Sequence, residues 1–260
     1  MTILFFLISF GASVIGAICG IGGGVIIKPT LDAFGVLSVS TISFLSGCTV
    51  LAMSGYSVAK SKLTGDSQIE MKTGTPLAIG AAIGGIAGKE MLSSVEALFV
   101  DANTVGAVQA ALLTVITIGT LIYTIKKDTI HTHQIKSLVV CVVIGILLGI
   151  MSSFLGIGGG PINLVVLYYF FSMTTKKAAQ NSLYIIFFSQ AASFLKTMVD
   201  GSAPVFPIAL LAGMVIAGIL GGSFGRKINR KIDEVIVNRL FIGLMVVIIL
   251  INTYNIVKYI

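Results

Sequence analysis

The sequence predicts an all-α polytopic membrane protein made of two inverted repeats, each a re-entrant helical hairpin followed by three transmembrane helices. Hydrophobic residues make up 56% of the 260 residues and charged residues only 10%, which lies outside the range of soluble globular domains. The segment Gly20–Gly24 returns letter for letter as Gly156–Gly160 in the second half of the chain. Lysine and arginine gather on one side of the membrane only if the two halves are inverted.

The first helix is expected from Thr2 to Cys19, and it runs into the glycines of Gly20–Gly24. The apolar piece that follows, Val25–Phe34, would be only about 15 Å long as a helix. Because the hydrocarbon core of a bilayer is about 30 Å thick, this piece cannot cross it. We therefore expect the first helix and the short piece to form a re-entrant hairpin that is broken at the Gly-Ile-Gly-Gly-Gly motif.

Three transmembrane helices complete the first half, beginning with Ser38–Ala59. The second, Leu77–Met91, has a glycine at every fourth position, which is typical of close packing between helices. This face could pack within one chain or between two copies in a homodimer. The third helix, Asn103–Ile125, closes a first repeat over residues 1–127, and a cytoplasmic connection follows over residues 128–136.

The pattern restarts in the second repeat, residues 137–260. The charge-free run from Ser137 to Thr175 would be roughly 58 Å long as one helix, so it has to break, and the second glycine motif marks the place. If the two halves are aligned without a gap so that Gly20 matches Gly156, Ser46 matches Ser182. This pairing of positions, called the repeat alignment below, shows that the duplication extends beyond the motif. The expected elements are, in order, Ser137–Leu155, Pro161–Phe171, Ala178–Leu195, a glycine-rich span at Gly213–Gly222, and Val235–Lys258.

The lysines and arginines decide between parallel and inverted halves, because cytoplasmic loops hold most of these residues. If each short piece continued across the membrane, eight of the 17 would lie on one side and nine on the other. If each piece turns back, thirteen lie on one side and four on the other. We therefore expect inverted halves in a bacterial-type plasma membrane, with both termini outside the cytoplasm. The thirteen are Lys60, Lys62, Lys72, Lys126, Lys127, Lys136, Lys176, Lys177, Arg226, Lys227, Arg230, Lys231 and Arg239.

The two glycine motifs are the expected substrate site. Backbone that leaves helical geometry inside a membrane is tolerated only where protein buries it or where it lines a wet cavity, and many transporters bind substrate at broken helices near the midplane. A helix that starts directly after the glycines directs free N–H groups and its positive dipole end at the break, which favours an anion. The alternatives are a packing notch and, with much less support, a phosphate loop, whose terminal Gly-Lys-Ser/Thr is lacking. The glycines assigned to the site are Gly20, Gly22, Gly23, Gly24, Gly156, Gly158, Gly159 and Gly160.

Two half-motifs surround these glycines. The first is GIGGGVIIKP from Gly20 to Pro29, and the second is GIGGGPIN from Gly156 to Asn163, followed by KAAQNSL from Lys177 to Leu183. Together they resemble the sulfite exporter TauE/SafE family, also called the TSUP permeases, and the resemblance covers almost the whole chain. It implies a secondary transporter of sulfur-containing anions such as sulfite, thiosulfate, sulfonates or sulfoacetate.

The second half departs from the pattern of that family at three positions, which leaves the particular substrate open. Val165 stands where the first half has Pro29, Pro161 directly follows the glycines, and Gln180 replaces a common glycine.

Five polar side chains near the motifs are further candidates for substrate binding: Ser46, Asn163, Asn181, Ser182 and Gln190. Hydroxyl and amide donors would suit an oxyanion, and side chains three or four positions apart share one face of a helix. The alternative is that these groups bond to neighbouring helices or to their own backbone.

Three charged residues close to the apolar segments have two interpretations each. Lys60 and its match Lys196 could attract anions at the two mouths, but such lysines more commonly extend to the membrane interface. Asp32 could couple transport to protons, although its place near the end of the short piece favours simple solvation at the interface. Tyr168 stands at the equivalent position of the second half.

The expected function is that of a permease that holds a small anion at the midplane between two half-helix N-termini and works by alternating access, coupled to protons or to sodium. The alternatives are a passive anion channel and a carrier for a different small organic anion. No enzyme activity, cofactor or metal site is expected, because the spans contain neither histidine nor paired carboxylates. The net charge of +7 is attributed to cytoplasmic loops and lipid headgroups rather than to nucleic acid, and the three cysteines are expected in the core.

Overall fold

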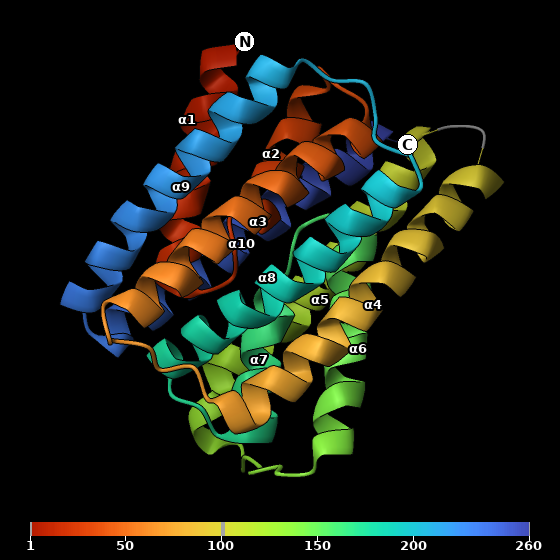
Figure 1. The fold of residues 1–260 in the computed structure, drawn as a ribbon. Helices are drawn as coiled ribbons and strands as arrows, with labels where there is room; N and C mark the ends of the chain where they lie inside the picture. Colours follow the sequence, from red (N-terminus) through yellow and green to blue (C-terminus); the bar gives the residue numbers. More distant parts are fainter. Residues whose placement is uncertain (1, 100–101, 260) are drawn as a thin grey trace.

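Ten α-helices and one short 3₁₀ helix make up the part of the chain that the computed structural model describes, residues 2–99 and 102–259 (Figure 1). The first half holds α1 (Thr2–Cys19), α2 (Gly24–Phe34), α3 (Val39–Leu63), α4 (Met71–Leu98) and α5 (Ala102–Lys126), followed by η1 (Lys127–Thr129). The second half holds α6 (Leu138–Phe154), α7 (Pro161–Phe171), α8 (Thr175–Val199), α9 (Ile208–Lys231) and α10 (Glu234–Tyr259). The all-helical prediction is confirmed for the described residues.

The duplication in the sequence is repeated in the helix boundaries. In the repeat alignment the first and last residues of α3 match the first and last residues of α8, and the first residue of α1 matches the first residue of α6. The two short helices, α2 and α7, both have 11 residues, which gives each a length of about 16 Å. The predicted order of elements is therefore found in both halves.

α4 is much longer than the expected span of Leu77–Met91, because it begins at Met71 and ends at Leu98. The expected span began after Pro76 and ended at Met91, whereas the helix also includes the turn that contains Lys72 before Pro76 and the turns that contain Glu96 after Met91. Polar turns at the ends of a membrane helix carry no apolar signal, so the sequence pattern did not reveal them.

Six helices among the described residues are long and apolar enough to cross a membrane, namely α1, α3, α5, α8, α9 and α10. α6 and α7 are apolar but shorter. A chain with this many such helices is a multi-pass membrane protein.

The two halves pack crosswise and reciprocally. α4 of the first half lies along α6 of the second, and α9 of the second half lies along α1 of the first (Figure 1). α3 and α8 contact each other, α4 also contacts α8, and α9 also contacts α3. The contact of α4 with α6 corresponds to the contact of α9 with α1, and the contact of α4 with α8 corresponds to the contact of α9 with α3. Each half therefore buries its apolar helices against the other half.

Glycines allow the closest of these approaches. At several glycines an added side chain would meet the backbone of the neighbouring helix. Two of the places between α4 and α6 match the two between α9 and α1. The pairs are Gly84 with Ile146, Gly88 with Ile150, Gly221 with Phe10, and Gly225 with Val14. The glycine face of α4 therefore packs within one chain, which decides between the two alternatives that the sequence left open.

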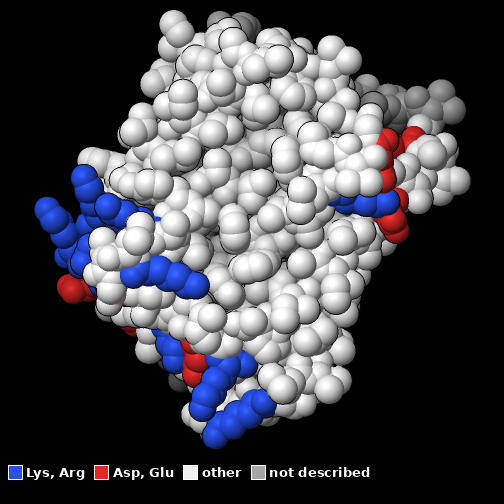
Figure 2. Space-filling view, in the orientation of Figure 1, with Lys and Arg blue, Asp and Glu red and all other residues white. Residues whose placement is uncertain are grey.

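Charge is unevenly distributed over the surface. The first turn of α1 and the last turn of α10 lie at the same end of the molecule in Figure 1. In the same orientation, Figure 2 shows lysine and arginine mainly at the lower, opposite end, with one further group at the right that is mixed with acidic residues. Most of the face between is uncharged, as the surface inside a bilayer has to be.

Replacing Gly84 by alanine is expected to lower the free energy of unfolding by about 1–3 kcal/mol, because the added methyl group would press on the carbonyl of Ile146 and force α4 away from α6. The matched control is Gly119→Ala on α5, where nothing lies within 4 Å of an added methyl group. That control should be neutral or slightly stabilising. Reversible unfolding in mixed micelles measures both, and equal stability of the two variants would contradict the packing described.

Candidate functional site

The two glycine motifs meet inside the molecule. A side chain at Gly24, the first residue of α2, would meet the carbonyl oxygen of Ile157, and one at Gly22 would lie 3.6 Å from the carbonyl oxygen of Gly158. The breaks before α2 and α7 therefore contact each other, although they belong to different halves of the sequence. The sequence analysis predicted that these two segments face each other.

Each break requires glycine because the backbone has a positive φ angle at two matched positions, and in the second break also at Gly159, where φ is 116°. The φ angles are 77° at Gly20 and 73° at Gly22, and 64° at Gly156 and 69° at Gly158. Residues with a side chain rarely adopt these angles. After each break a short helix begins. Its N-cap residue is a glycine, Gly23 for α2 and Gly160 for α7, so no side chain caps the backbone N–H groups of either first turn.

Residues of α3 and α8 close the space around the motifs in a matched way. Gly20 packs against Ala179, and Gly156 packs against Ser43, which is the residue that matches Ala179 in the repeat alignment. A side chain at Gly158 would press on Val50, and one at Gly159 would press on Ile186.

Val50 and Ile186 belong to a buried apolar cluster that also contains Met53 and Leu183. Val50 and Ile186 both lie next to Gly22, so this cluster, called the apolar barrier below, lies beside the place where the two motifs meet.

Two pockets lie toward opposite ends of α3 and α8. The Arg226 pocket includes Ser57, Ser61, Asp66, Ala179, Gln180 and Arg226. The Lys89 pocket includes Ser43, Lys89, Ser153, Gly156, Gln190 and Ser193. Seven positions of the first match seven of the second in the repeat alignment: Ala17 with Ser153, Ser57 with Ser193, Val58 with Phe194, Ser61 with Thr197, Ala179 with Ser43, Gln180 with Phe44, and Leu183 with Gly47.

Each pocket contains a cation directly after a glycine, Arg226 after Gly225 and Lys89 after Gly88. The helices that carry them, α9 and α4, run toward opposite ends of the molecule in Figure 1. The two pockets are therefore equivalent positions in the two halves.

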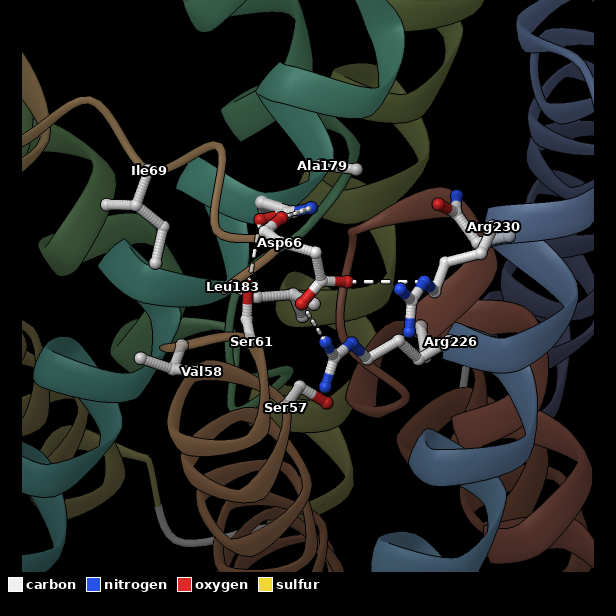
Figure 3. Close-up of a pocket in the computed structure, with 12 residues that line it drawn as sticks. Ser57, Val58, Ser61, Asp66, Ile69, Ala179, Leu183, Arg226 and Arg230 are labelled. Carbon is white, nitrogen blue, oxygen red and sulfur yellow. Dashed lines mark hydrogen bonds and ion pairs between the residues drawn. The ribbon is translucent and has the colours of Figure 1, made fainter. Parts of the chain in front are cut away.

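An ion-pair cluster holds the cations of the Arg226 pocket (Figure 3). Asp66 accepts from Arg226 Nη2 at 2.5 Å and lies 3.3 Å from Arg230 Nε. Thr64 also contacts both Asp66 and Arg226. Burial raises the pKa of Asp66, but the hydrogen bonds from Thr64 and Arg226 and the charges of the two arginines outweigh it, so that the pKa lies below its usual value. Asp66 is thus ionised at neutral pH and competes with any anion for Arg226.

Two neighbouring amides of α8 hold the segment that carries Asp66. Gln180 Oε1 accepts from Ser61 Oγ at 3.1 Å and from the N–H of Gln68 at 2.8 Å. Asn181 Oδ1 accepts from the N–H of Glu70 at 3.0 Å, and its Nδ2 donates to the carbonyls of Gln68 and Lys177. The side chain of Asn181 is therefore hydrogen-bonded to this segment. Asn181 does not line either pocket.

The other predicted polar residues lie closer to the motifs. Ser46 and Ser182 are fully buried, and each lies one helical turn before Val50 or Ile186 on the same helix face. Their hydroxyl groups and the Oδ1 atom of Asn163 have no hydrogen-bond partner among the described residues. Unpartnered buried polar groups are costly, so these three are available to a ligand.

Gln190, the remaining predicted amide, lines the Lys89 pocket and donates to Ser152 Oγ at 3.2 Å. Of the predicted lysines, Lys60 is exposed, whereas Lys196 is bound by Glu90 and Asp200 at 3.0 and 3.1 Å.

The expectation for Asp32 was wrong. Asp32 is only 4% exposed and its Oδ2 lies 2.6 Å from the ammonium group of Lys28, so it is not solvated at the membrane interface. Lys28 was not among the functional residues predicted from the sequence. The available signal was the spacing of the two charges, four positions apart in a short apolar helix, which brings them together on one face.

The family model described as "Sulfite exporter TauE/SafE" matches residues 5–251. Neither a curated protein nor a solved structure matches this chain.

Replacing Asn181 by alanine is expected to loosen residues 68–70, because it removes the acceptor of the Glu70 N–H and a donor to the carbonyl of Gln68. The loss of about 1–3 kcal/mol should speed amide exchange of this segment by about tenfold or more. Hydrogen–deuterium exchange measures it, with Gln190→Ala as the control, since Gln190 bonds to Ser152 instead. Unchanged exchange in the Asn181 variant would contradict the assigned role.

Proposed function

Since the chain belongs to the sulfite exporter TauE/SafE family, a family of membrane transporters, we propose that it is a secondary carrier for a small sulfur-containing anion such as sulfite, thiosulfate or an organosulfonate. The observation that carries this proposal is the contact between the two glycine motifs, together with two equivalent pockets, the Arg226 pocket and the Lys89 pocket, toward opposite ends of α3 and α8. Carriers need a binding site that can be reached in turn from each side of the membrane.

The chemistry at the motifs supports an anion as the substrate. The first turns of α2 and α7 have no side-chain caps, so each presents the positive end of a helix dipole. α2 also presents backbone N–H donors, whereas α7 presents fewer, because its first residue, Pro161, has no N–H and the N–H of Asn163 donates to the carbonyl of Gly160. Ser46, Ser182 and Asn163 provide buried polar groups that have no other partner among the described residues. Hydroxyl and amide donors can bind several oxygens of one oxyanion.

The proposed topology is two inverted repeats, each with a re-entrant hairpin. Helices of 11 residues, such as α2 and α7, are too short to span, which supports hairpins that turn back at the glycines. The basic end of the molecule in Figure 2 is opposite the end at which α1 begins and α10 ends, which supports termini outside the cytoplasm. In this orientation the Arg226 pocket faces the cytoplasm and the Lys89 pocket faces the outside.

The apolar barrier favours a carrier over a passive channel. A channel needs a continuous polar path, whereas Val50, Met53, Leu183 and Ile186 form a buried apolar cluster beside the glycine motifs, and Leu183 of this cluster lines the Arg226 pocket. An anion can pass only if the halves move relative to each other. The crosswise packing of α4 on α6 and of α9 on α1 gives two matched contacts, and we propose that these move as rigid units during alternating access.

Valine at Gly159 is expected to lower anion transport by at least about tenfold, a cost of about 1.4 kcal/mol or more, because its side chain would overlap with Ile186. Valine at Gly23, which would crowd Ser13, should act in the same way. The control is Gly243→Val on α10, where nothing lies within 4 Å. Flux into liposomes, with the amount of inserted protein measured separately, tests the proposal; normal flux in both motif variants would remove it.

Anion specificity can be measured by thermal unfolding of the purified protein. A substrate that binds only the folded state stabilises it by about 2.7 kcal/mol at a concentration 100 times its dissociation constant. Sulfite, thiosulfate and methanesulfonate are compared with acetate at equal ionic strength. We expect at least one sulfur anion to raise the midpoint more than acetate does, and a response to acetate alone would contradict the substrate class.

A further inference from the structure

Lys28 and Asp32 are the only charged side chains that are buried in the described part of the chain. They lie four positions apart on α2, with Lys28 Nζ 2.6 Å from Asp32 Oδ2 and side-chain exposures of 4% and 5%. An ion pair withdrawn from water rarely stabilises a fold, because desolvation of the two charges costs as much as their attraction returns. Charged groups inside a membrane protein are therefore candidates for a functional role.

The second half of the molecule shows that this fold does not need the pair. In the repeat alignment Lys28 is replaced by Leu164 and Asp32 by Tyr168, and both of these side chains are buried in equivalent places on α7. In the second half of the chain, two uncharged residues thus occupy the positions that two charged residues occupy in the first half. The pair is a property of the first half alone.

Lys28 adjoins the second glycine motif. A Cβ atom built on Gly156 would lie 3.2 Å from Lys28 Cε and 2.6 Å from Ser43 Oγ. Gly156 and Ser43 both line the Lys89 pocket, so the lysine side chain lies directly behind a residue of the pocket wall. The hydroxyl group of Ser43 has no partner among the described residues. An anion between the motifs could therefore reach the ammonium group after a small movement.

Asp32 has few other partners. Its Oδ1 atom is buried and has no hydrogen-bond partner among the described residues. Besides Lys28, the charged and titratable groups that face it are Lys258 and Tyr259 of α10. Lys258 Nζ donates to the backbone carbonyls of Asp32 and Ala33, at 3.3 and 2.9 Å, rather than to the carboxylate. If the ammonium group of Lys28 left, the carboxylate would be buried without its partner and would take up a proton.

We infer that Lys28 is the counter-charge of the transported anion and that Asp32 is the group that couples transport to protons. This inference rests on the proposed carrier function. In the resting state the Lys28 ammonium group is paired with the Asp32 carboxylate. When the anion arrives, the ammonium group pairs with the anion, and Asp32 takes one proton from water on the same side. On release the proton leaves Asp32 and the original pair forms again, so one proton moves with each anion and a monovalent anion is carried without net charge.

The test separates proton coupling from anion movement. The protein is placed in liposomes, and two fluxes of labelled methanesulfonate and thiosulfate are measured, namely exchange against the same anion at equal pH and accumulation driven by an imposed pH gradient. These anions stay ionised near neutral pH, so any coupled proton is bound by the protein. Asp32→Asn should keep exchange within about threefold of the native protein and lose the response to the pH gradient.

Two further variants distinguish a functional pair from a structural one. Lys28→Leu should lower the apparent affinity for both anions at least tenfold. The double variant Lys28→Leu/Asp32→Tyr copies the second half, and it should unfold close to the native midpoint yet carry neither anion.

Accumulation by Asp32→Asn that still follows the pH gradient, or native transport by the double variant, would overturn the inference while leaving the carrier function standing. If the native protein exchanges neither anion, the proposed function fails and the inference fails with it. If Asp32→Asn does not fold, the double variant alone decides.

Discussion

The fold depends on one constraint, which is that backbone inside a membrane cannot leave helical geometry unless protein surrounds it. The two Gly-Ile-Gly-Gly-Gly breaks meet this constraint by contacting each other, with Gly24 against Ile157, and by packing against α3 and α8. Because each break is covered by elements of the other half, the halves have to interlock. The crosswise contacts of α4 with α6 and of α9 with α1 follow from the same need.

The points where the two halves differ are as informative as the points where they match. The glycine breaks, the covering residues Ser43 and Ala179, and the frames of the two pockets are equivalent. The charges are not, since Arg226 is bound by Asp66 in one pocket and the pair of Lys28 and Asp32 has no counterpart in α7. A symmetric frame gives a carrier two equivalent access routes. Unequal charges can make the inward-facing and outward-facing states of the carrier differ in energy. Coupling to a second ion requires such a difference.

Much of this architecture could be predicted from the sequence because its strongest signals are local. Four glycines in an apolar run mark a break, and a repeat of the same five letters marks a duplication. The ends of α4 were missed because the turns before Pro76 and after Met91 are polar and carry no apolar signal. The partners of Asn181 at Glu70 and Gln68 lie far from it in the sequence, in the other half of the chain, and no local pattern identifies them. Asp32 was misjudged because its burial depends on α10 and α3, which only the three-dimensional packing brings over α2.

The central claim is that the anion binds between the N-termini of α2 and α7. The most direct measurement is the anomalous X-ray signal of selenite, a selenium analogue of sulfite, in crystals of the protein grown from a lipid phase. The account predicts a peak within hydrogen-bond distance of the first-turn N–H groups of α2 and α7, close to Ser46 and Ser182. A peak confined to the Arg226 pocket or the Lys89 pocket, with none at the glycine motifs, would contradict it.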